Sequence, residues 1–437
     1  ADGVTNAEII KSGSNTMTIN GDFSDFSGQV SVAEGILKYI ADDANDKYYN
    51  ANSTKVHGGA TLIFDIANAT RGGVPAQSLS GLASQPNSSG NGNFIKQGDG
   101  TLYMTGDNTE FVGNVTVDAG TLAFDSAQGA SSDSFFGSDA DIRINQSGIL
   151  YSNIDMAVNG NLKGDGTFKA DNINLSVNGD NSGLANFTQT GGVTTVASGD
   201  SLFKNNNITD GKVIFNANSF LADGSTFKTS NSVVEILDNS DANSIIGAVN
   251  NGTNSGLDLI LNNSNTTADL NIDGTNIETL TTQGNVTYGG ILSGTGGVTN
   301  EGTLVLEGDA SGFTGTFSQE IAGTSTTVAE TGKVFGGDKN INAGSLNITA
   351  ESVNYNKVHL GSDAQLKHTS TGVTGSSTIS ESVVNFIDGA SGATATFNNG
   401  DYTLAGAVDN GNANRVVFNN SDVILGDVTE FMGGTTY

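Results

Sequence analysis

Short runs in which apolar and polar residues alternate follow one another along most of the chain, separated by glycine, asparagine and other small polar residues. A period of two is typical of β-strands, in which every second side chain faces the same way. Residues 97–124 predict three strands, Leu102–Met104, Val115–Val117 and Leu122–Phe124. We expect turns between them at Gly106-Asp107-Asn108 and at Asp118-Ala119-Gly120. This succession amounts to about one coil of a stacked β structure.

The same alternation predicts further short strands elsewhere. They are Val4–Ile10, Thr61–Ile66, Ile142–Ile144, Gly148–Tyr151, Met156–Val158, Ile173–Val177, Val193–Val196, Val213–Phe215, Val233–Leu237, Leu257–Leu261, Leu270–Ile272, Leu346–Ile348, Val353–Tyr355, Val358–Leu360, Val383–Ile387, Ala393–Phe397, Tyr402–Leu404, Val416–Phe418 and Val423–Leu425. No stretch predicts a helix of three turns. Residues 41–96 form a loop-rich insertion region, in which Ala67–Gly92 is the first candidate for contact with a partner because so long a loop is often functional, with solvated disorder as the alternative.

The pattern of residues 101–124 recurs at 16–39, 303–324 and 423–437, although the third copy has Glu320-Ile321-Ala322 where the second glycine turn is expected. The copies share glycines, which we expect at turns that need a positive φ, and a lone phenylalanine, which we expect to cap the core between two strands. These repeat positions are Gly21, Gly28, Gly35, Gly106, Gly113, Gly120, Gly308, Gly315, Gly426, Gly433, Phe26, Phe111, Phe313 and Phe431.

The motif runs Gly-Thr-Leu, Gly-Asp, Phe, Gly-x-Val-x-Val and again Gly-Thr-Leu. It resembles the passenger-associated repeat of bacterial autotransporters, the proteins of type V secretion. Residues 288–298 likewise resemble the lead-in that such repeats often have. The resemblance implies export across the outer membrane to the extracellular space or the bacterial cell surface.

We therefore expect an all-β fold, a right-handed parallel β-helix that forms a single-stranded solenoid over residues 1–437 as one domain. A sandwich does not repeat one turn motif at both ends of so long a chain, whereas stacked coils do. The right hand is the one expected for parallel strands joined by crossovers. At roughly 20–25 residues per coil the chain would form roughly twenty coils.

Composition agrees with this expectation. The chain has 60 glycines, 2 prolines, no cysteine and only 14% charged residues, which suits short strands joined by tight turns. Disorder is excluded because the apolar alternation persists along most of the chain. The missing cysteines exclude disulfides and suit secretion through a channel in an unfolded state.

The net charge is −29. Nucleic acid and anionic membrane surfaces are therefore not expected as partners, since both require a basic patch. The acidity favours solubility outside the cell, with cation binding as the alternative. No apolar run is long enough for a membrane helix, so we expect no direct membrane insertion of this segment.

The chain ends suggest processing or truncation. Ala1-Asp2-Gly3 fits a mature end left by cleavage after a small residue, although an expression design would look the same. Tyr437 stops within a repeat, as truncation of a longer protein would leave it. Alternatively, the first strand of a neighbouring subunit would complete that last coil.

Candidate catalytic and metal-binding groups are sparse. The three histidines, His57, His359 and His368, lack the spacing of zinc ligands, and Gly336-Gly337-Asp338 is only a fragment of a calcium-binding repeat, so we expect no metal and no cofactor. Gly199-Asp200-Ser201 looks like part of a protease motif, with His57 earlier in the chain as its candidate histidine, but Leu202 stands where the oxyanion turn needs glycine.

Carboxylates of the kind that polysaccharide-active enzymes use occur in two places. Asp139, Asp141 and Arg143 would share one face of a strand, where a solvated salt bridge is the simpler interpretation. Asp42, Asp43 and Asp46 lie in a loop. Asparagine pairs have two interpretations, turns and stacked amide ladders, or a surface for sugars or a sister molecule. They are Asn206-Asn207, Asn250-Asn251, Asn262-Asn263, Asn398-Asn399 and Asn419-Asn420.

The repeat and the missing catalytic cluster together predict a non-enzymatic surface protein. We expect an adhesin, or a protein that associates with itself, whose Asn, Thr and Ser faces bind a glycan or protein of a host-cell or bacterial surface, or another copy of the chain. One alternative is a subunit of an extracellular filament or sheath assembled end to end. A further alternative is a polysaccharide-active β-helix enzyme.

Overall fold

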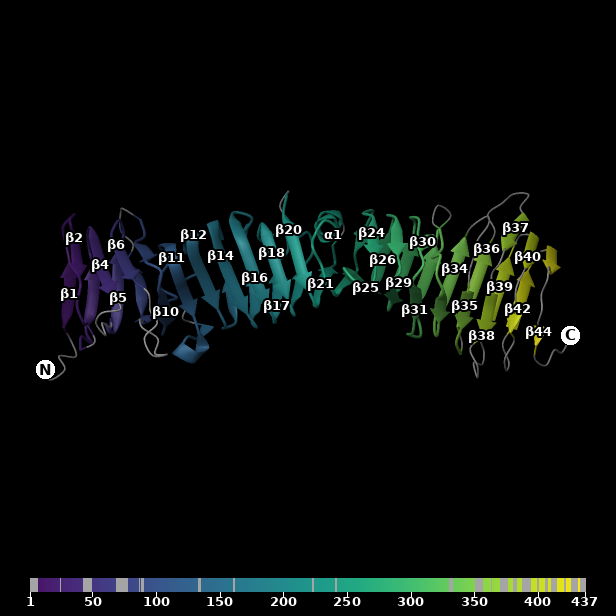
Figure 1. The fold of residues 1–437 in the computed structure, drawn as a ribbon, viewed down its shortest axis with the longest axis horizontal. Helices are drawn as coiled ribbons and strands as arrows, with labels where there is room; N and C mark the ends of the chain where they lie inside the picture. The colour runs from purple at the N-terminus through teal and green to yellow at the C-terminus, as the bar shows by residue number, and fades with distance from the viewer. Residues whose placement is uncertain are drawn as a thin grey trace. The chain divides into compact units, whose positions relative to one another are not determined.

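Parallel strands stacked coil upon coil make up most of the described chain (Figure 1). The computed structural model describes residues 7–369 except 24, 42–48, 68–77, 86, 88–89, 133–134, 160–161, 222–223, 240–241, 330–332, 350–356 and 363. Beyond residue 369 it describes the strands β37 to β44.

Contacts within the chain define two compact units, Ala1–Val213 with Ser219–Thr226, and Ile214–Asn218 with Phe227–Tyr437. The fold is a parallel β-solenoid of about 15 turns, as predicted in kind but with fewer turns than the roughly twenty expected. Excursions lengthen some of the coils. Thr61 of one coil pairs with Asn93 of the next, and Asn114 pairs with Asp141.

The first unit has three sheets, in the strand orders β1-β3-β5-β8, β2-β4-β6-β9-β11-β12-β14-β16-β18 and β13-β15-β17, while β10 pairs with β11 and β7. Neighbouring strands are parallel, as β1 and β3 show. The strands are β1 Glu8–Lys11, β2 Thr16–Ile19, β3 Gln29–Val32, β4 Ile36–Ala41, β5 Ser53–His57, β6 Thr61–Ile66, β7 Ser78–Ser80, β8 Leu82–Gln85, β9 Asn93–Gln97, β10 Thr101–Thr105, β11 Asn114–Phe124, β12 Asp141–Ser152, β13 Met156–Val158, β14 Leu162–Asp171, β15 Asn174–Val177, β16 Leu184–Thr190, β17 Val193–Val196 and β18 Asn205–Thr209. β19 Lys212–Phe215 and β20 Thr226–Ser230 lie where the chain divides into units.

The second unit has four sheets, in the orders β21-β22-β25-β28-β31-β33-β35-β38-β41-β44, β23-β26-β29-β32-β34-β36-β39-β42, β24-β27-β30 and β37-β40-β43. Its strands are β21 Ser232–Leu237, β22 Leu257–Asn262, β23 Asn265–Thr266, β24 Leu270–Ile272, β25 Ile277–Gln283, β26 Asn285–Tyr288, β27 Leu292–Gly294, β28 Gly297–Asn300, β29 Thr303–Leu306, β30 Gly312–Phe313, β31 Thr316–Gln319, β32 Ser325–Val328, β33 Lys339–Ile341, β34 Ser345–Thr349, β35 Lys357–Leu360, β36 Gln365–Thr369, β37 Ser376–Ile379, β38 Val383–Phe386, β39 Thr394–Asn398, β40 Asp401–Leu404, β41 Val408–Asp409, β42 Arg415–Asn419, β43 Asp422–Leu425 and β44 Phe431–Met432.

The alternation in the sequence becomes an alternation of burial. In β4 and in β6 every second residue is buried, so that Leu37 and Tyr39 stack directly over Leu62 and Phe64 in the next coil. Aromatic rings form columns inside the coils, as in Phe168, Phe187 and Phe203, whose neighbouring centroids are 4.6–6.0 Å apart. Each inward side chain therefore packs on the coils before and after its own.

Among the described residues, short helices interrupt the strands as a 3₁₀ turn η1 at Ser126–Gln128 and as the α-helix α1 at Asn243–Asn250, which Figure 1 labels. Sequence analysis did not predict α1, which is shorter than three turns. Ile245, Ile246 and Val249 are buried on one of its faces, and their spacing is the sequence pattern from which this helix could have been predicted. No helix of the described residues combines the length and apolarity that a membrane span requires.

Most predicted strands are present, often a residue longer at one end. Val115–Val117 and Leu122–Phe124, predicted as two strands, are instead one strand β11, and 142–144 and 148–151 likewise merge into β12. The reason is an irregularity rather than a break, since the pairing of β11 with β12 shifts register after Val117 and then continues.

Part of the predicted long loop is also strand. Residues 78–80 and 82–85 form β7 and β8, because Leu79, Leu82 and Ala83 are buried in the core. The predicted strand at 353–355, both prolines, and Asp42, Asp43 and Asp46 lie outside the described residues, as do the first three residues and Tyr437. Of the predicted strand Val4–Ile10, the structure describes β1.

Candidate interaction surface

The repeat glycines meet two different needs. Gly35, Gly106 and Gly120 have φ between 64° and 67°, as the turn interpretation expects. Gly28, Gly113 and Gly315 have no positive φ, but a Cβ on each would lie 2.0–2.1 Å from a backbone oxygen of the preceding coil. These three positions therefore require glycine because two coils approach closely.

The remaining repeat positions differ among themselves. A Cβ at Gly308 would lie 2.0 Å from the Gly290 oxygen, whereas one at Gly21 would meet no atom within 4 Å. Phe111 and Phe313 are completely buried, and Phe26 is half-buried with its ring 4.6 Å from that of Phe23. Gly426 and Gly433 lie outside the described residues, and of Phe431 only its place in β44 is described.

A pair of buried lysines lies just before the first two repeat copies, and sequence analysis missed both. Lys96 is completely buried, and its Nζ donates to the carbonyl oxygens of Gln97, Gly98 and Ala119 at 2.7–3.1 Å. Burial lowers the pKa of Lys96 to about 8, against the opposing effect of Asp65 and Asp99.

Lys11 occupies the equivalent position before the first copy. Its Nζ donates to the carbonyl oxygens of Ser12, Gly13 and Glu34 at 2.5–3.0 Å, the residues that align with the three acceptors of Lys96. The sequence signal was a lysine on the inward parity of an apolar strand, two residues after Ile9 in one case and after Phe94 in the other. Each ammonium thus binds carbonyls from two successive coils at a corner.

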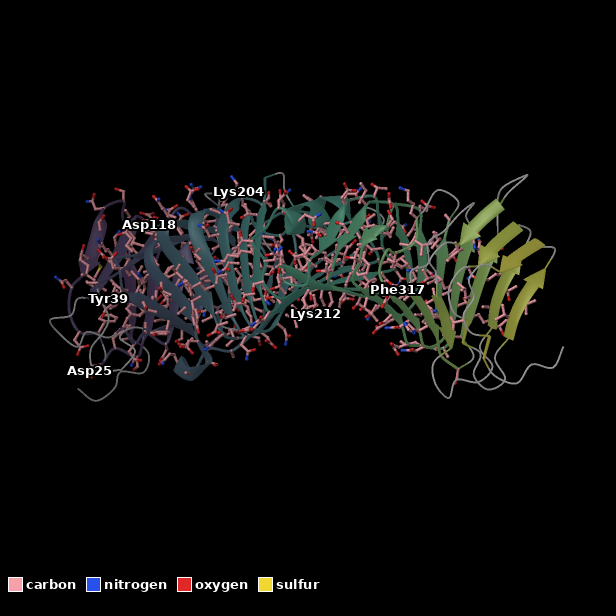
Figure 2. All side chains as sticks on the ribbon, turned by 45° about the vertical axis from the view of Figure 1, so that its right-hand side comes forward. Asp25, Tyr39, Asp118, Lys204, Lys212 and Phe317 are labelled. Carbon is pink, nitrogen blue, oxygen red and sulfur yellow. The ribbon has the colours of Figure 1, made fainter. Side chains whose placement is uncertain are left out.

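Outward polar side chains form hydrogen-bonded rows from coil to coil. In the first unit Asn114 donates to Asn93 at 2.9 Å, and Asp118 accepts from Gln97 and Asn145 at 3.1 and 2.6 Å. Figure 2 shows such side chains along the outside of the ribbon, with Asp118 labelled.

The second unit has comparable rows. Asn262 donates to Glu235 and Gln283, Gln283 donates to Glu301, and all three bonds measure 2.8–3.3 Å. These rows hold the outward side chains of neighbouring coils in fixed positions.

Asparagines serve both turns and ladders. Asn172, Asn218, Asn231 and Asn263 have positive φ, which agrees with the turn interpretation. The pair Asn206-Asn207, expected at a turn, instead lies within strand β18. Asn206 is buried there, and its Nδ2 donates to the carbonyl oxygens of Phe203 and Thr226. Its side-chain amide therefore links neighbouring coils by hydrogen bonds inside the core.

The candidate catalytic residues make structural contacts. Ser201 is completely buried, and its Oγ donates to Asp180 at 2.7 Å and accepts from the backbone N–H of Asn181. His57 lies in β5, where its Nε2 is 3.0 Å from the Ser31 hydroxyl. The structure therefore does not bring Ser201 and His57 together.

The carboxylate candidates are also separated. Asp141 pairs with Lys163 at 2.5 Å, whereas Arg143 bonds to Asn145, and Asp139 precedes the strand rather than sharing its face. Asp141 Oδ1 is buried without a hydrogen-bond partner. Within the part of the chain that the structure describes, no group of three or more His, Asp or Glu is arranged to hold a metal ion. His359 lies in β35 and His368 is buried in β36.

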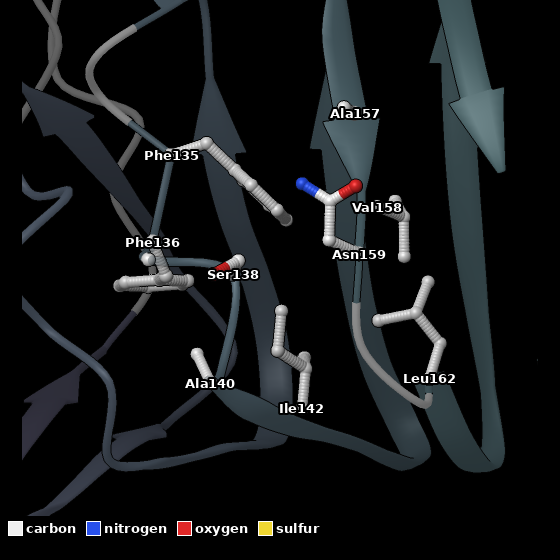
Figure 3. Close-up of a pocket in the computed structure, with 10 residues that line it drawn as sticks. Phe135, Phe136, Ser138, Ala140, Ile142, Ala157, Val158, Asn159 and Leu162 are labelled. Atoms are coloured by element: carbon white, nitrogen blue, oxygen red, sulfur yellow. The ribbon is translucent and has the colours of Figure 1, made fainter. Parts of the chain in front are cut away.

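Two hollows differ in character. In the first unit Phe135, Phe136, Ile142, Val158 and Leu162 surround a space of about 10 Å³, with Asn159 beside it (Figure 3). So small an apolar space is a packing gap with room for about one water. In the second unit Thr327, Asn347, Ile348, Thr349, Lys367 and Thr369 line a polar hollow of about 290 Å³ on strands β32, β34 and β36.

Comparison with known protein families identifies two of the repeats. The passenger-associated transport repeat family matches residues 9–38 and 94–124, which contain most of the first copy and all of the second. No curated protein and no solved structure matches the chain. The two matched repeats and the parallel β-solenoid together support an autotransporter passenger domain with β repeats.

Proposed function

We propose that this passenger domain is a non-enzymatic adhesin. It would bind a glycan or protein of a host-cell or bacterial surface, or another copy of itself, through the outward polar side chains of its sheets. The observation that supports the proposal is the coil-to-coil row of hydrogen-bonded polar side chains, such as Asn93 with Asn114 and Asn262 with Gln283. An exported surface location follows from the repeat family.

Two physical features favour adhesion through such rows. Side chains that already bond to their neighbours lose little further conformational entropy when a ligand binds. The rows also repeat once per coil, so a long polymeric ligand or a second solenoid can make many weak contacts at once, and the contacts add through avidity.

The test uses beads coated with the purified chain, and albumin-coated beads as the control. We expect the coated beads to bind cultured host cells or bacteria, or to cluster with one another, while the albumin beads do neither. The same protein is incubated with polysaccharides and with casein. Turnover of either polymer without any adhesion would overturn the proposal.

A second candidate function is end-to-end assembly into a filament, favoured by the exposed apolar residues of the first described coil. Ile10 of β1 and Met17 of β2 are 59% and 38% exposed, and Met17 pairs with the core residue Leu37 of the following coil. Electron microscopy of the purified chain tests this. Filaments that Met17→Lys abolishes would support assembly, and single particles at concentrations that coat cells would exclude it.

A further inference from the structure

The polar hollow of the second unit has a regular floor. Thr327, Asn347 and Lys367 lie side by side on β32, β34 and β36, and Thr349 pairs with Thr369 in the next row along the strands. Its volume of about 290 Å³ is close to the lower limit of small-molecule sites, about 300 Å³. The hollow therefore has room for a small polar group rather than for a folded domain.

The charge of the hollow differs from that of the molecule. The net charge of the chain is −29, yet none of the described residues that line the hollow is acidic and one is a lysine. Lys38 and Lys333 form ion pairs with Asp65 and Asp309, whereas Lys367 forms no ion pair or hydrogen bond with another described residue. Its ammonium is thus available to an anionic group.

The surrounding side chains suit a hydroxylated ligand. The three threonine hydroxyls and the Asn347 amide can each donate and accept hydrogen bonds, as sugar hydroxyls do. Among the lining residues that the structure describes, Ile348 is the only apolar one, and at 1% exposure it presents almost no apolar surface.

The position of the strands disfavours a peptide. Extended peptides gain affinity by adding a strand to a sheet edge. However, β34 has β32 and β36 as neighbours, and these in turn pair with β29 and β39, so the hollow lies in the interior of a sheet. Recognition there depends on side chains alone.

We propose that this hollow binds a carboxylate-bearing sugar of a surface glycan, with the carboxylate on the Lys367 ammonium and the ring hydroxyls on Thr327, Asn347, Thr349 and Thr369. The inference rests on the proposed adhesive function, because it names the ligand class of one of the polar faces. Neutral sugars and acidic peptides are the competing outcomes of the test.

The test titrates the purified chain with a galacturonic acid trimer, its methyl ester and an oligoglutamate peptide, each followed by calorimetry or saturation-transfer NMR. We expect the acid trimer to bind best, and Lys367→Met to weaken that binding about five- to tenfold, because a charge-assisted hydrogen bond is lost. Lys367→Arg should keep most of the affinity.

The matched control is Lys169→Met, which removes another exposed lysine from within a strand, β14, and should leave binding unchanged. Circular dichroism verifies that both variants fold. Equal binding of the ester, tighter binding of the peptide, or unchanged binding by Lys367→Met would overturn the proposal. If beads coated with Lys367→Met or with the wild-type chain adhere equally to cells while neither binds the trimer, the hollow proposal fails and the adhesive function stands.

Discussion

At the scale of single residues, the paired lysines show how the repeat closes its corners. The chain has to turn between strands, and the turn leaves carbonyl oxygens that face inward without a strand to donate to them. The Lys96 ammonium satisfies three such oxygens at once, and Lys11 does so in the other matched copy. A charged side chain inside the solenoid thus replaces backbone hydrogen bonds.

Replacing Lys96 with methionine should lower the free energy of unfolding by about 2–4 kcal/mol, because buried carbonyls lose their donor while the apolar stem is kept. Urea unfolding followed by circular dichroism measures the loss. Lys169→Met, which changes an exposed lysine, is the control and should unfold as the wild type does. An equal midpoint for both variants would show that water satisfies the carbonyls instead.

Asp309 allows a prediction about pH. A hydrogen bond from Lys333, followed by hydrogen bonds from Ser311, lowers the pKa of Asp309 to about 2 from its ordinary value of 3.8. Because the folded pKa is the lower one, the carboxylate stabilises the fold above pH 3.8 and loses this contribution as the pH falls toward 2.

Lys333→Met should therefore raise the pKa of Asp309 part of the way to 3.8, since the Ser311 bonds remain. Carboxyl ¹³C NMR titration measures the change. Asp155, whose pKa is lowered by hydrogen bonds from Asn174, serves as the internal control and should not move. If the pKa of Asp309 is the same in Lys333→Met as in the wild type, the contact between Lys333 and Asp309 is not formed in solution.

At the scale of the strand and turn, one repeat copy contains a glycine at which a Cβ would clash and another at which a Cβ would fit. A Cβ at Gly28 would lie 2.0 Å from the Ala7 oxygen and 2.7 Å from Cζ of Phe26. At Gly21 it would meet nothing within 4 Å, and φ there is not positive.

Gly28→Ala should therefore destabilise the chain by about 1–3 kcal/mol, as overpacking does, because the preceding coil has to move away. Gly21→Ala is the matched control and should change the free energy of unfolding by only a small fraction of the Gly28→Ala effect. The melting temperatures of the two variants, measured by circular dichroism, test this difference. If both alanine variants melt together, coil spacing is not what selects glycine at position 28.

At the scale of the whole molecule, each coil packs mainly on the coils next to it in sequence. Phe187 illustrates this, since its ring contacts Phe168 and Phe203 of the adjacent coils at 5.6 and 4.6 Å. In such an array the stability is nearly a sum of contributions from neighbouring coils, so the destabilisation caused by one substitution should remain local.

Phe187→Ala removes a buried ring and should cost about 3–5 kcal/mol locally. Hydrogen exchange followed by mass spectrometry should show faster exchange in β14, β16 and β18, and unchanged exchange in β31, β32 and β34. Phe220→Ala, which removes a ring that is 42% exposed, is the control and should alter exchange little. Faster exchange throughout the chain would mean that the coils unfold as a single cooperative unit.

The fold class could be predicted because its cause is local. A side chain on every second residue faces inward, so the apolar alternation of β4 or β6 is readable without knowing any partner strand. The turn glycines Gly35, Gly106 and Gly120 were readable for the same reason, since positive φ is a property of one residue.

What only the tertiary structure decided depends on contacts between coils. The merging of two predicted strands into β11, the burial of β7 and β8, and the count of about 15 turns all follow from which strand each segment pairs with. The carbonyl contacts of Lys96 and the hollow at Lys367 likewise bring together residues from neighbouring coils. Alternation specifies which way a side chain faces, but not which side chain of the next coil it meets, because the lengths of the excursions set that register.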